Sequence, residues 1–397
     1  MTGRGSDTGG LFALACLVFV VGGISGSAIG VVWIYVQADF NVTLSALGAL
    51  VTAATLGRLA TSSASGPLIN RFGIAFIMMA GLLITACSMF GFALAESWLV
   101  VMLVAFGSGL GAGVIATGLN AFAAVHFSAR QMNWLHGSYG VGSTIGPLLI
   151  TFIVIDLRLD WRWDYVIFTA VRLLLFGLFI ITRQRWRLSE ARAEGAGENH
   201  ASLSATLRLP MIWLMAGTFM LATGVELVTG QFANSFLIEA RAIDAKTAGA
   251  WVSLYWASLT ISRFVGGIII ARLGSLRFLR LNSLLMLVGA ALLAADMGAL
   301  VSLLGLACIG FAIAPFSPML TADTPGRVGP AHVANAIGLQ FTAASLGMAL
   351  LPWLAGWLAE TQGLEVIPRF VFVTALATLA LHEAICLRER KIRARLV

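Results

Sequence analysis

The sequence has 397 residues, of which 59% are hydrophobic and 11% are charged, and its formal net charge is +7. Soluble domains are about 25% charged, so this composition excludes an ordinary soluble protein and indicates one that lies mostly in lipid. A helix needs about 20 apolar residues to cross a bilayer, and the chain has room for about a dozen such helices with short connections.

Twelve apolar stretches of suitable length follow one another along the chain. They lie at residues 11–36, 46–66, 74–94, 98–126, 132–155, 164–183, 209–238, 247–271, 277–296, 298–321, 331–359 and 366–387. The first stretch is longer than the apolar region of a signal peptide, which is about 7–15 residues, so we expect it to be retained. The sequence therefore predicts an all-α membrane protein with 12 transmembrane helices.

Helix one contains Gly22-x-x-x-Gly26-x-x-x-Gly30, and helix five contains Gly142-x-x-x-Gly146. Because glycine has no Cβ, such strings allow neighbouring membrane helices to approach closely. We expect these glycines to mark helix crossings, with a role in packing, in gating, or in both.

A polar connection divides the predicted helices six and six. It covers residues 184–208 and is charged and rich in Ala, Gly and Ser. We expect it to be a cytoplasmic linker between an N-terminal six-helix bundle, residues 1–183, and a C-terminal six-helix bundle, residues 209–397.

The two halves share short motifs at a nearly constant offset. Asn70, Arg71 and Gly73 follow the second stretch, and Ala271, Arg272 and Gly274 follow the eighth, 201 positions later. Gly142 and Pro147 correspond to Gly347 and Pro352 at an offset of 205. These matches predict two pseudo-symmetric bundles, an arrangement found in transporters whose solute site lies at mid-membrane depth.

Basic residues are concentrated on one side of the predicted membrane. If the connections that follow the even-numbered helices are placed on the cytoplasmic side, only five basic residues lie on the opposite side. They are Arg158, Arg162, Arg241, Lys246 and Arg369. Cytoplasmic loops carry the excess of basic residues, so both termini are predicted to be cytoplasmic in a multi-pass protein of the plasma membrane, such as a bacterial inner membrane. The positive charge then faces the anionic leaflet of the lipid bilayer, and no nucleic-acid partner is expected.

These features resemble the major facilitator superfamily over nearly the whole chain, in helix count, central loop and the Gly-x-x-x-Asn-Arg-x-Gly string that ends at Gly73. Further strings are similar to the fucose-permease-like sugar transporters. They are Leu135-His136-Gly137-Ser-Tyr139-Gly140, Gly224-Val-Glu226, Tyr255-Trp256 and Ala314-Pro315-Phe316-Ser-Pro318. The resemblance implies the major facilitator fold, a small-molecule substrate, a monomer, and no cofactor or metal.

One departure from the resembled group concerns proton coupling. The fucose permease uses carboxylates in helices one and four, whereas here the first stretch contains no acid, with Asp39 only beyond its outer end, and the fourth offers only Asn120. Protons remain a candidate coupling ion through Glu226, and facilitated diffusion competes with that reading.

Four ionisable residues are expected to lie at hydrocarbon depth: Arg58, Arg172, Glu226 and Arg263. A charge at the centre of a membrane helix costs about 2.5–3.5 kcal/mol, so each should face a cavity or a partner. Glu226 is expected to bind a solute hydroxyl or to exchange a proton, or else to form a structural ion pair with Arg263 or Arg58. Arg172 is typical of a snorkelling or bundle-packing residue.

Amides and aromatic rings near these charges complete the predicted substrate site, because amides bind hydroxyls and flat rings stack on sugars. With Glu226, the predicted residues are Gln231, Asn234, Asn120, Trp33, Gln37, Tyr139, Trp256 and Gln340. The predicted inner gates are Asn70, Arg71, Gly73, Arg272 and Gly274. Alternatively, Arg71 and Arg272 only anchor helix ends in the interface.

The sequence thus favours a secondary active or facilitative transporter that moves a small polar solute, first of all a sugar, by alternating access. The alternative is a multidrug or organic-anion exporter on the same fold, proton-coupled through Glu226. An ATP-driven pump is excluded for this chain alone, because neither Lys246 nor Lys391 lies in a phosphate-binding loop. No enzyme is expected, because neither a His-Glu-x-x-His nor a Gly-x-Ser-x-Gly string occurs.

Overall fold

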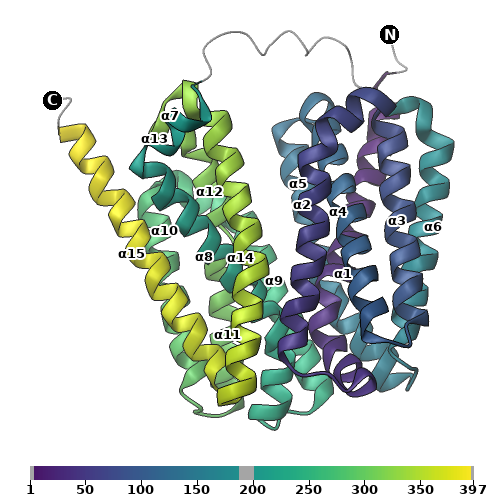
Figure 1. Ribbon diagram of the computed structural model, residues 1–397. Helices are drawn as coiled ribbons and strands as arrows, with labels where there is room; N and C mark the ends of the chain where they lie inside the picture. Colours follow the sequence, from purple (N-terminus) through teal and green to yellow (C-terminus); the bar gives the residue numbers. More distant parts are fainter. Residues whose placement is uncertain (1–3, 187–200, 395–397) are drawn as a thin grey trace. The chain divides into compact units, whose positions relative to one another are not determined.

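The computed structural model describes residues 4–186 and 201–394, with their side chains except at residues 4–8, 62–67, 70, 124, 129, 133, 267, 271, 334 and 391–394. Throughout these ranges the regular structure is helical. The chain forms two compact units, residues 1–195 and 196–397. In Figure 1 the first unit runs from purple through blue to teal, and the second from teal through green to yellow.

The first unit consists of long helices joined by short turns. They are α1 (Arg4–Phe40), α2 (Ser45–Phe72), α3 (Ile74–Leu94), α4 (Trp98–His126), α5 (Ala129–Thr151) and α6 (Arg162–Thr182). A π-helical turn, η1 (Phe152–Asp156), extends α5, and a 3-10 turn, η2 (Arg183–Arg185), extends α6. Successive helices alternate in direction, so α1 and α3 end where α6 begins, at what we call the far end of the unit.

The second unit repeats this plan with more interruptions. Its elements are α7 (Leu203–Leu207), α8 (Pro210–Ser235), η4 (Phe236–Ala240), α9 (Ala245–Leu273), α10 (Ser275–Ala294), α11 (Ala299–Ile313), α12 (Phe316–Ala322), α13 (Thr324–Val328), η5 (Pro330–His332), α14 (Val333–Gln362) and α15 (Val366–Ala394). Its far end is where α8 and α10 end and α15 begins.

Each of the twelve predicted stretches coincides with a long helix or helix pair. In the described residues, ten helical spans are long and apolar enough to cross a membrane. The other two long helices, α2 and α9, carry intramembrane arginines, Arg58 and Arg263, as well as Arg71 and Arg272 near their ends. The prediction of an all-α membrane fold is confirmed, and only the tenth stretch is broken, between α11 and α12, where Pro315 removes a backbone donor.

The two units share one packing order. In the first, α1 packs on α5, α2 on α4, and α3 on both α4 and α6. The corresponding contacts of the second unit are α8 on α14, α9 on α11, and α10 on both α11 and α15. The duplicated sequence motifs therefore correspond to a repeated arrangement of six helices.

Glycines allow the closest of these crossings. A Cβ at Gly142 of α5 would collide with the carbonyl oxygen of Val20, and one at Gly347 of α14 with that of Met220. In α1 the glycine in closest contact is Gly23, which lies outside the predicted 22, 26, 30 string. A Cβ at Gly26 would lie 2.7 Å from the Tyr139 hydroxyl. Glycine at these positions lets backbones touch, as expected for membrane helices.

The repeated Arg-x-Gly motif forms the same helix break in both units. Gly73 has φ of 77° and Gly274 has φ of 74°, a conformation that favours glycine. Their backbone N–H groups donate to Ile69 and Ile270, each at 2.8 Å. Both motifs thus end one long helix and begin the next without a loop.

Candidate functional site

An ion pair lies inside the second unit, within helices rather than at their ends. The Arg263 guanidinium of α9 is 3.8 Å from the Glu226 carboxylate of α8. Glu226 belongs to the apolar span Pro210–Ala240, so this charge is at membrane depth. The Tyr255 hydroxyl donates to the Glu226 backbone carbonyl at 2.8 Å and fixes α9 against α8 beside the pair.

The Glu226–Arg263 pair is looser than the ion pairs that Arg327 forms in the same unit. Arg327 contacts Glu389 at 2.7 Å and Asp323 at 2.9 Å, distances typical of charge-assisted hydrogen bonds. At 3.8 Å the Glu226–Arg263 contact is too long for one, and the two side chains remain 22% and 27% exposed. Both charged groups therefore keep hydrogen-bonding capacity for a ligand.

Trp256 lies one helical turn farther along the same α8–α9 seam. Its indole covers Gly230, where a Cβ would lie 2.5 Å from the ring carbon Cζ2 and 3.1 Å from Cη2. The side chain is only 4% exposed, and its Nε1–H has no hydrogen-bond partner among the described residues. Trp256 is thus placed near the pair, but its faces are packed rather than open for stacking on a sugar.

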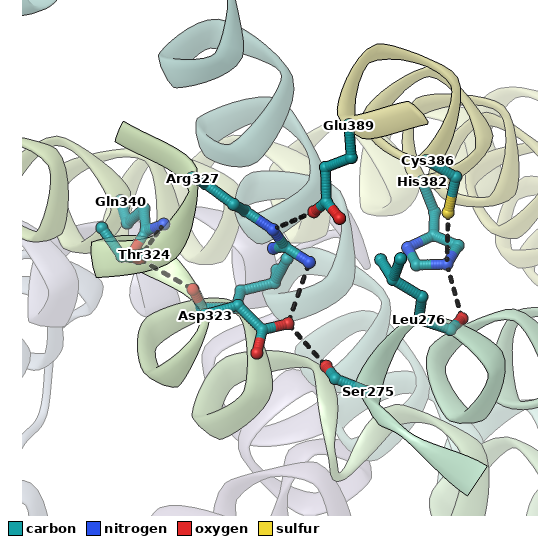
Figure 2. A network of polar contacts seen from close by, with 10 residues as sticks. Ser275, Leu276, Asp323, Thr324, Arg327, Gln340, His382, Cys386 and Glu389 are labelled. Carbon is teal, nitrogen blue, oxygen red and sulfur yellow. Dashed lines mark hydrogen bonds and ion pairs between the residues drawn. The ribbon is translucent and has the colours of Figure 1, made fainter. Parts of the chain in front are cut away.

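Several other predicted site residues are also covered. Gln231 and Asn234 of α8 are 2% and 1% exposed, and Trp33 of α1 is fully buried with its ring edge-on to Trp98. The Gln340 amide exchanges hydrogen bonds with Thr324, as Figure 2 shows. A solute could reach these four side chains only if the helices around them moved, and their assignment stays a prediction.

The remaining predicted residues belong to the first unit. Gln37, Asn120 and Tyr139 are half-buried, and the Tyr139 hydroxyl lies against Gly26. Arg58 of α2 is exposed. A shared site with Glu226, or an Arg58–Glu226 pair, stays a prediction because the two units are described separately.

The predicted gate residues lie at helix ends. Arg71 ends α2 and places its guanidinium 5.2 Å from the centre of the Phe72 ring, and Arg272 lies exposed in the last turn of α9. Gly73 and Gly274 form the breaks described above. The side chain of Asn70 lies outside the described residues, so its gating role stays a prediction.

Arg172 is buried within the first unit rather than snorkelling to the interface. Its side chain is 6% exposed, and it donates to the Ser25 hydroxyl of α1 at 2.6 Å. The bundle-packing alternative is the one that the structure shows.

The sequence reasoning missed Asp164 of α6. Its side chain is fully buried, and neither carboxylate oxygen has a hydrogen-bond partner among the described residues. Asp164 is the first residue of a predicted apolar stretch, and nothing in the neighbouring sequence distinguishes it from an acid in the membrane interface.

A polar network that the sequence did not indicate ties α10, α13 and α15 together (Figure 2). Arg327 joins Asp323 to Glu389, and Asp323 accepts from Ser275 at 2.6 Å. Nearby, the His382 ring Nε2 lies 3.0 Å from the Leu276 carbonyl oxygen. This network fastens three helices of one unit.

His382 also belongs to a group that could in principle hold a metal ion. Ligand atoms of His382, Glu383 and Cys386 lie within 4.8 Å of one another. The imidazole already contacts the Leu276 carbonyl oxygen, and Glu383 forms an ion pair with Arg280. These contacts make the group a structural tie between α10 and α15.

The whole chain is similar to several known proteins. The chain is 25% identical to Bypass of stop codon protein 6 of Saccharomyces cerevisiae over 93% of the chain and 81% of that protein. It is 23% identical to the glucose/mannose transporter GlcP of Bacillus subtilis over 76% of the chain and 75% of that protein. A crystal structure of a bacterial homologue of the human lysosomal transporter Spinster aligns with a TM-score of 0.80 and 13% identity, covering 97% and 98% of the two chains.

The family assignment follows from the sequence itself. The model of the Major Facilitator Superfamily matches residues 14–352, which is most of the chain. The likeness to solved structures adds the same fold of helices. This chain therefore belongs to the Major Facilitator Superfamily, a family of transporters.

Proposed function

We propose that the protein is a secondary carrier, active or facilitative, that moves a small polar solute across the plasma membrane by alternating access, with a sugar as the first candidate. The observation that carries the proposal is the loose Glu226–Arg263 pair at membrane depth. An intramembrane ion pair is costly unless it is tight or functional, and this one is not tight.

The chemistry of the pair suits a hydroxylated, uncharged solute. The Glu226 carboxylate can accept hydrogen bonds from hydroxyl groups, and the Arg263 guanidinium can donate to hydroxyl oxygens. Because the two charges balance each other, a neutral solute can bind without leaving either one uncompensated. Similarity to a protein named as a glucose/mannose transporter supports a sugar.

The same pair makes an exporter of cationic drugs the weaker proposal. A cation at Glu226 would be repelled by Arg263, whose side chain lies on the same partly exposed seam. An organic anion at Arg263 would meet Glu226 in the same way. Either exporter would need the pair to separate first.

The proposal is tested by uptake of labelled glucose and mannose into proteoliposomes containing the purified protein. Loss of one hydrogen bond to a charged group is worth about 1.5–3 kcal/mol, so we expect Glu226→Gln to lower uptake about tenfold or more. Glu360→Gln, at an exposed position near the end of α14, is the matched control and should transport as the native chain does. Normal transport and coupling by Glu226→Gln would refute the site assignment.

Proton coupling is decided in the same vesicles. If Glu226 carries the proton, an inward proton gradient accelerates native uptake, and Glu226→Gln loses that acceleration. If native uptake does not depend on the gradient, the carrier is facilitative.

The cytoplasmic location of both termini, part of the same proposal, is tested by reacting terminal tags with a membrane-impermeant reagent in intact cells.

A further inference from the structure

An arginine holds three helix ends together at the far end of the first unit. Arg162, the first residue of α6, pairs with Asp39 in the last turn of α1 and donates to the Ala95 carbonyl, the C-cap of α3, at 3.4 Å. Its guanidinium also lies 4.5 Å from the centre of the Trp161 ring, whose Nε1–H donates to Asp39 at 2.8 Å. We call Arg162, Asp39 and Ala95 the first clamp.

The far end of the second unit has the same construction. Arg241, which follows η4 at the end of α8, forms a two-pronged ion pair with Glu365, the residue before α15. It donates to the Leu293 carbonyl of α10 at 3.1 Å, and its guanidinium lies 4.6 Å from the centre of the Phe236 ring. Asp296 approaches its Nε at 3.2 Å. Arg241, Glu365 and Leu293 form the second clamp.

The clamps occupy equivalent positions of the repeat with their charges exchanged. Arg241 stands 202 positions after Asp39, and Glu365 stands 203 positions after Arg162. The acid is on the first helix in one unit and before the sixth helix in the other. In both units the arginine donates to a carbonyl of the third helix and lies against an aromatic ring, although the arginine belongs to the sixth helix in one unit and to the end of the first helix in the other.

Both units therefore have an ion pair that links the first helix to the sixth, although the acidic and basic residues have exchanged places. We infer that the two clamps are positioning elements of the transport cycle: each holds the far ends of the first, third and sixth helices of its unit together, so that these ends move as one. In the first unit α1 and α6 contact each other at few other places, among them the Arg172–Ser25 hydrogen bond, so the ion pair is their tie at the far end. The effect on transport rests on the proposed carrier function.

The first clamp is tested by hydrogen–deuterium exchange of the full-length protein in detergent. Asp39→Arg and Arg162→Asp should each raise deuterium uptake severalfold in peptides covering residues 36–44, 90–98 and 156–164. The double variant Asp39→Arg with Arg162→Asp gives the first clamp the polarity of the second and should return exchange to near the native level. Peptides of the second unit serve as the internal control.

The inference is overturned if the double variant exchanges as fast as either single variant, or if the single variants exchange like the native chain. A purely local loss of packing would not be rescued by reversing both charges, whereas a clamp would be. Rescue therefore separates positioning from packing.

The second clamp is tested with Glu365→Arg and with Arg241→Glu plus Glu365→Arg. Because the Arg241 side chain is only 3% exposed, Glu365→Gln, which keeps size and removes charge, is measured alongside. Faster exchange at residues 236–244 and 360–368 in Glu365→Gln supports the clamp even where the reversed pair fails to fold. Native exchange in a folded Glu365→Gln protein contradicts it.

Sugar uptake supplies the second readout. Single clamp variants should lower the maximal rate severalfold with an unchanged half-saturating concentration, and the reciprocal double variant should recover it. If the native chain takes up no sugar, the proposed substrate is wrong, while the exchange experiment still decides the clamp.

Discussion

Gly142→Ala tests whether the close α1–α5 crossing is essential to the first unit. The added Cβ would collide with the Val20 carbonyl oxygen and lie 2.8 Å from its carbon and 2.9 Å from its Cα. Ordinary contacts between such atoms are about 3.5 Å or longer, so relieving the collision with the oxygen requires a separation of more than about 1 Å. Overpacking of this kind costs about 1–3 kcal/mol, and a collision with rigid backbone belongs near the upper value.

The opposing effect is smaller. Replacing glycine by alanine in a helix gains at most about 1 kcal/mol from helix propensity. The expected net loss is about 2 kcal/mol, which corresponds to a midpoint about 4–8 °C lower for a unit of this size. Gly347→Ala, at the equivalent crossing of α14 with α8, should behave in the same way.

The assay is thermal unfolding of the purified protein in detergent, compared at one scan rate because unfolding of such proteins is often irreversible. Gly177→Ala is the matched control, since a Cβ at Gly177 of α6 meets no atom within 4 Å. That variant should unfold at the native temperature or slightly above it. Equal midpoints for Gly142→Ala and Gly177→Ala would show that the α1–α5 crossing does not need glycine at position 142.

Three further predictions use the same assay. Asp164→Asn should leave the midpoint unchanged or raise it, because the buried carboxyl has no described hydrogen-bond partner to lose; a clear fall would reveal one. Arg327→Gln should cost about 3 kcal/mol by removing the buried cation that joins Asp323 to Glu389, and a native-like midpoint would contradict the structural tie. Hydrogen bonds from the Thr247 side chain and backbone hold the pKa of Asp244 below its usual value, so this N-cap stabilises above about pH 4 and stops doing so as pH falls through the lowered pKa. The midpoint difference between native and Asp244→Ala should therefore shrink in acid, and a constant difference would refute it.

Local sequence was enough for the helices and for the repeat. The length of each apolar run sets where a helix can cross lipid, and two of the twelve predicted stretches, 74–94 and 98–126, have the same bounds as α3 and α4. Glycine at positions 73 and 274 is recognisable because only glycine readily adopts the conformation that both breaks require. The Glu226–Arg263 pair could be named as a structural alternative because two opposite charges in lipid need partners.

The rotation of each helix about its axis could not be read from the sequence. In lipid, the outward face of a helix is as apolar as the face that packs against its neighbours, so hydrophobic periodicity does not mark the buried side. For this reason the tertiary structure alone places Gly23 rather than Gly22 in the closest crossing, buries Trp256, and directs Arg172 to Ser25.

The order of residues along the chain was enough to predict a duplicated bundle of twelve membrane helices typical of transporters, with Arg263 as one candidate partner of Glu226. Which charges meet depends on the packed structure, because Asp39 and Arg162, like Arg241 and Glu365, are more than 120 positions apart and lie near helix ends, where charged residues are common. Their pairing depends on three helix ends converging at the same place. That convergence arises from the packing of whole helices, which no local pattern specifies.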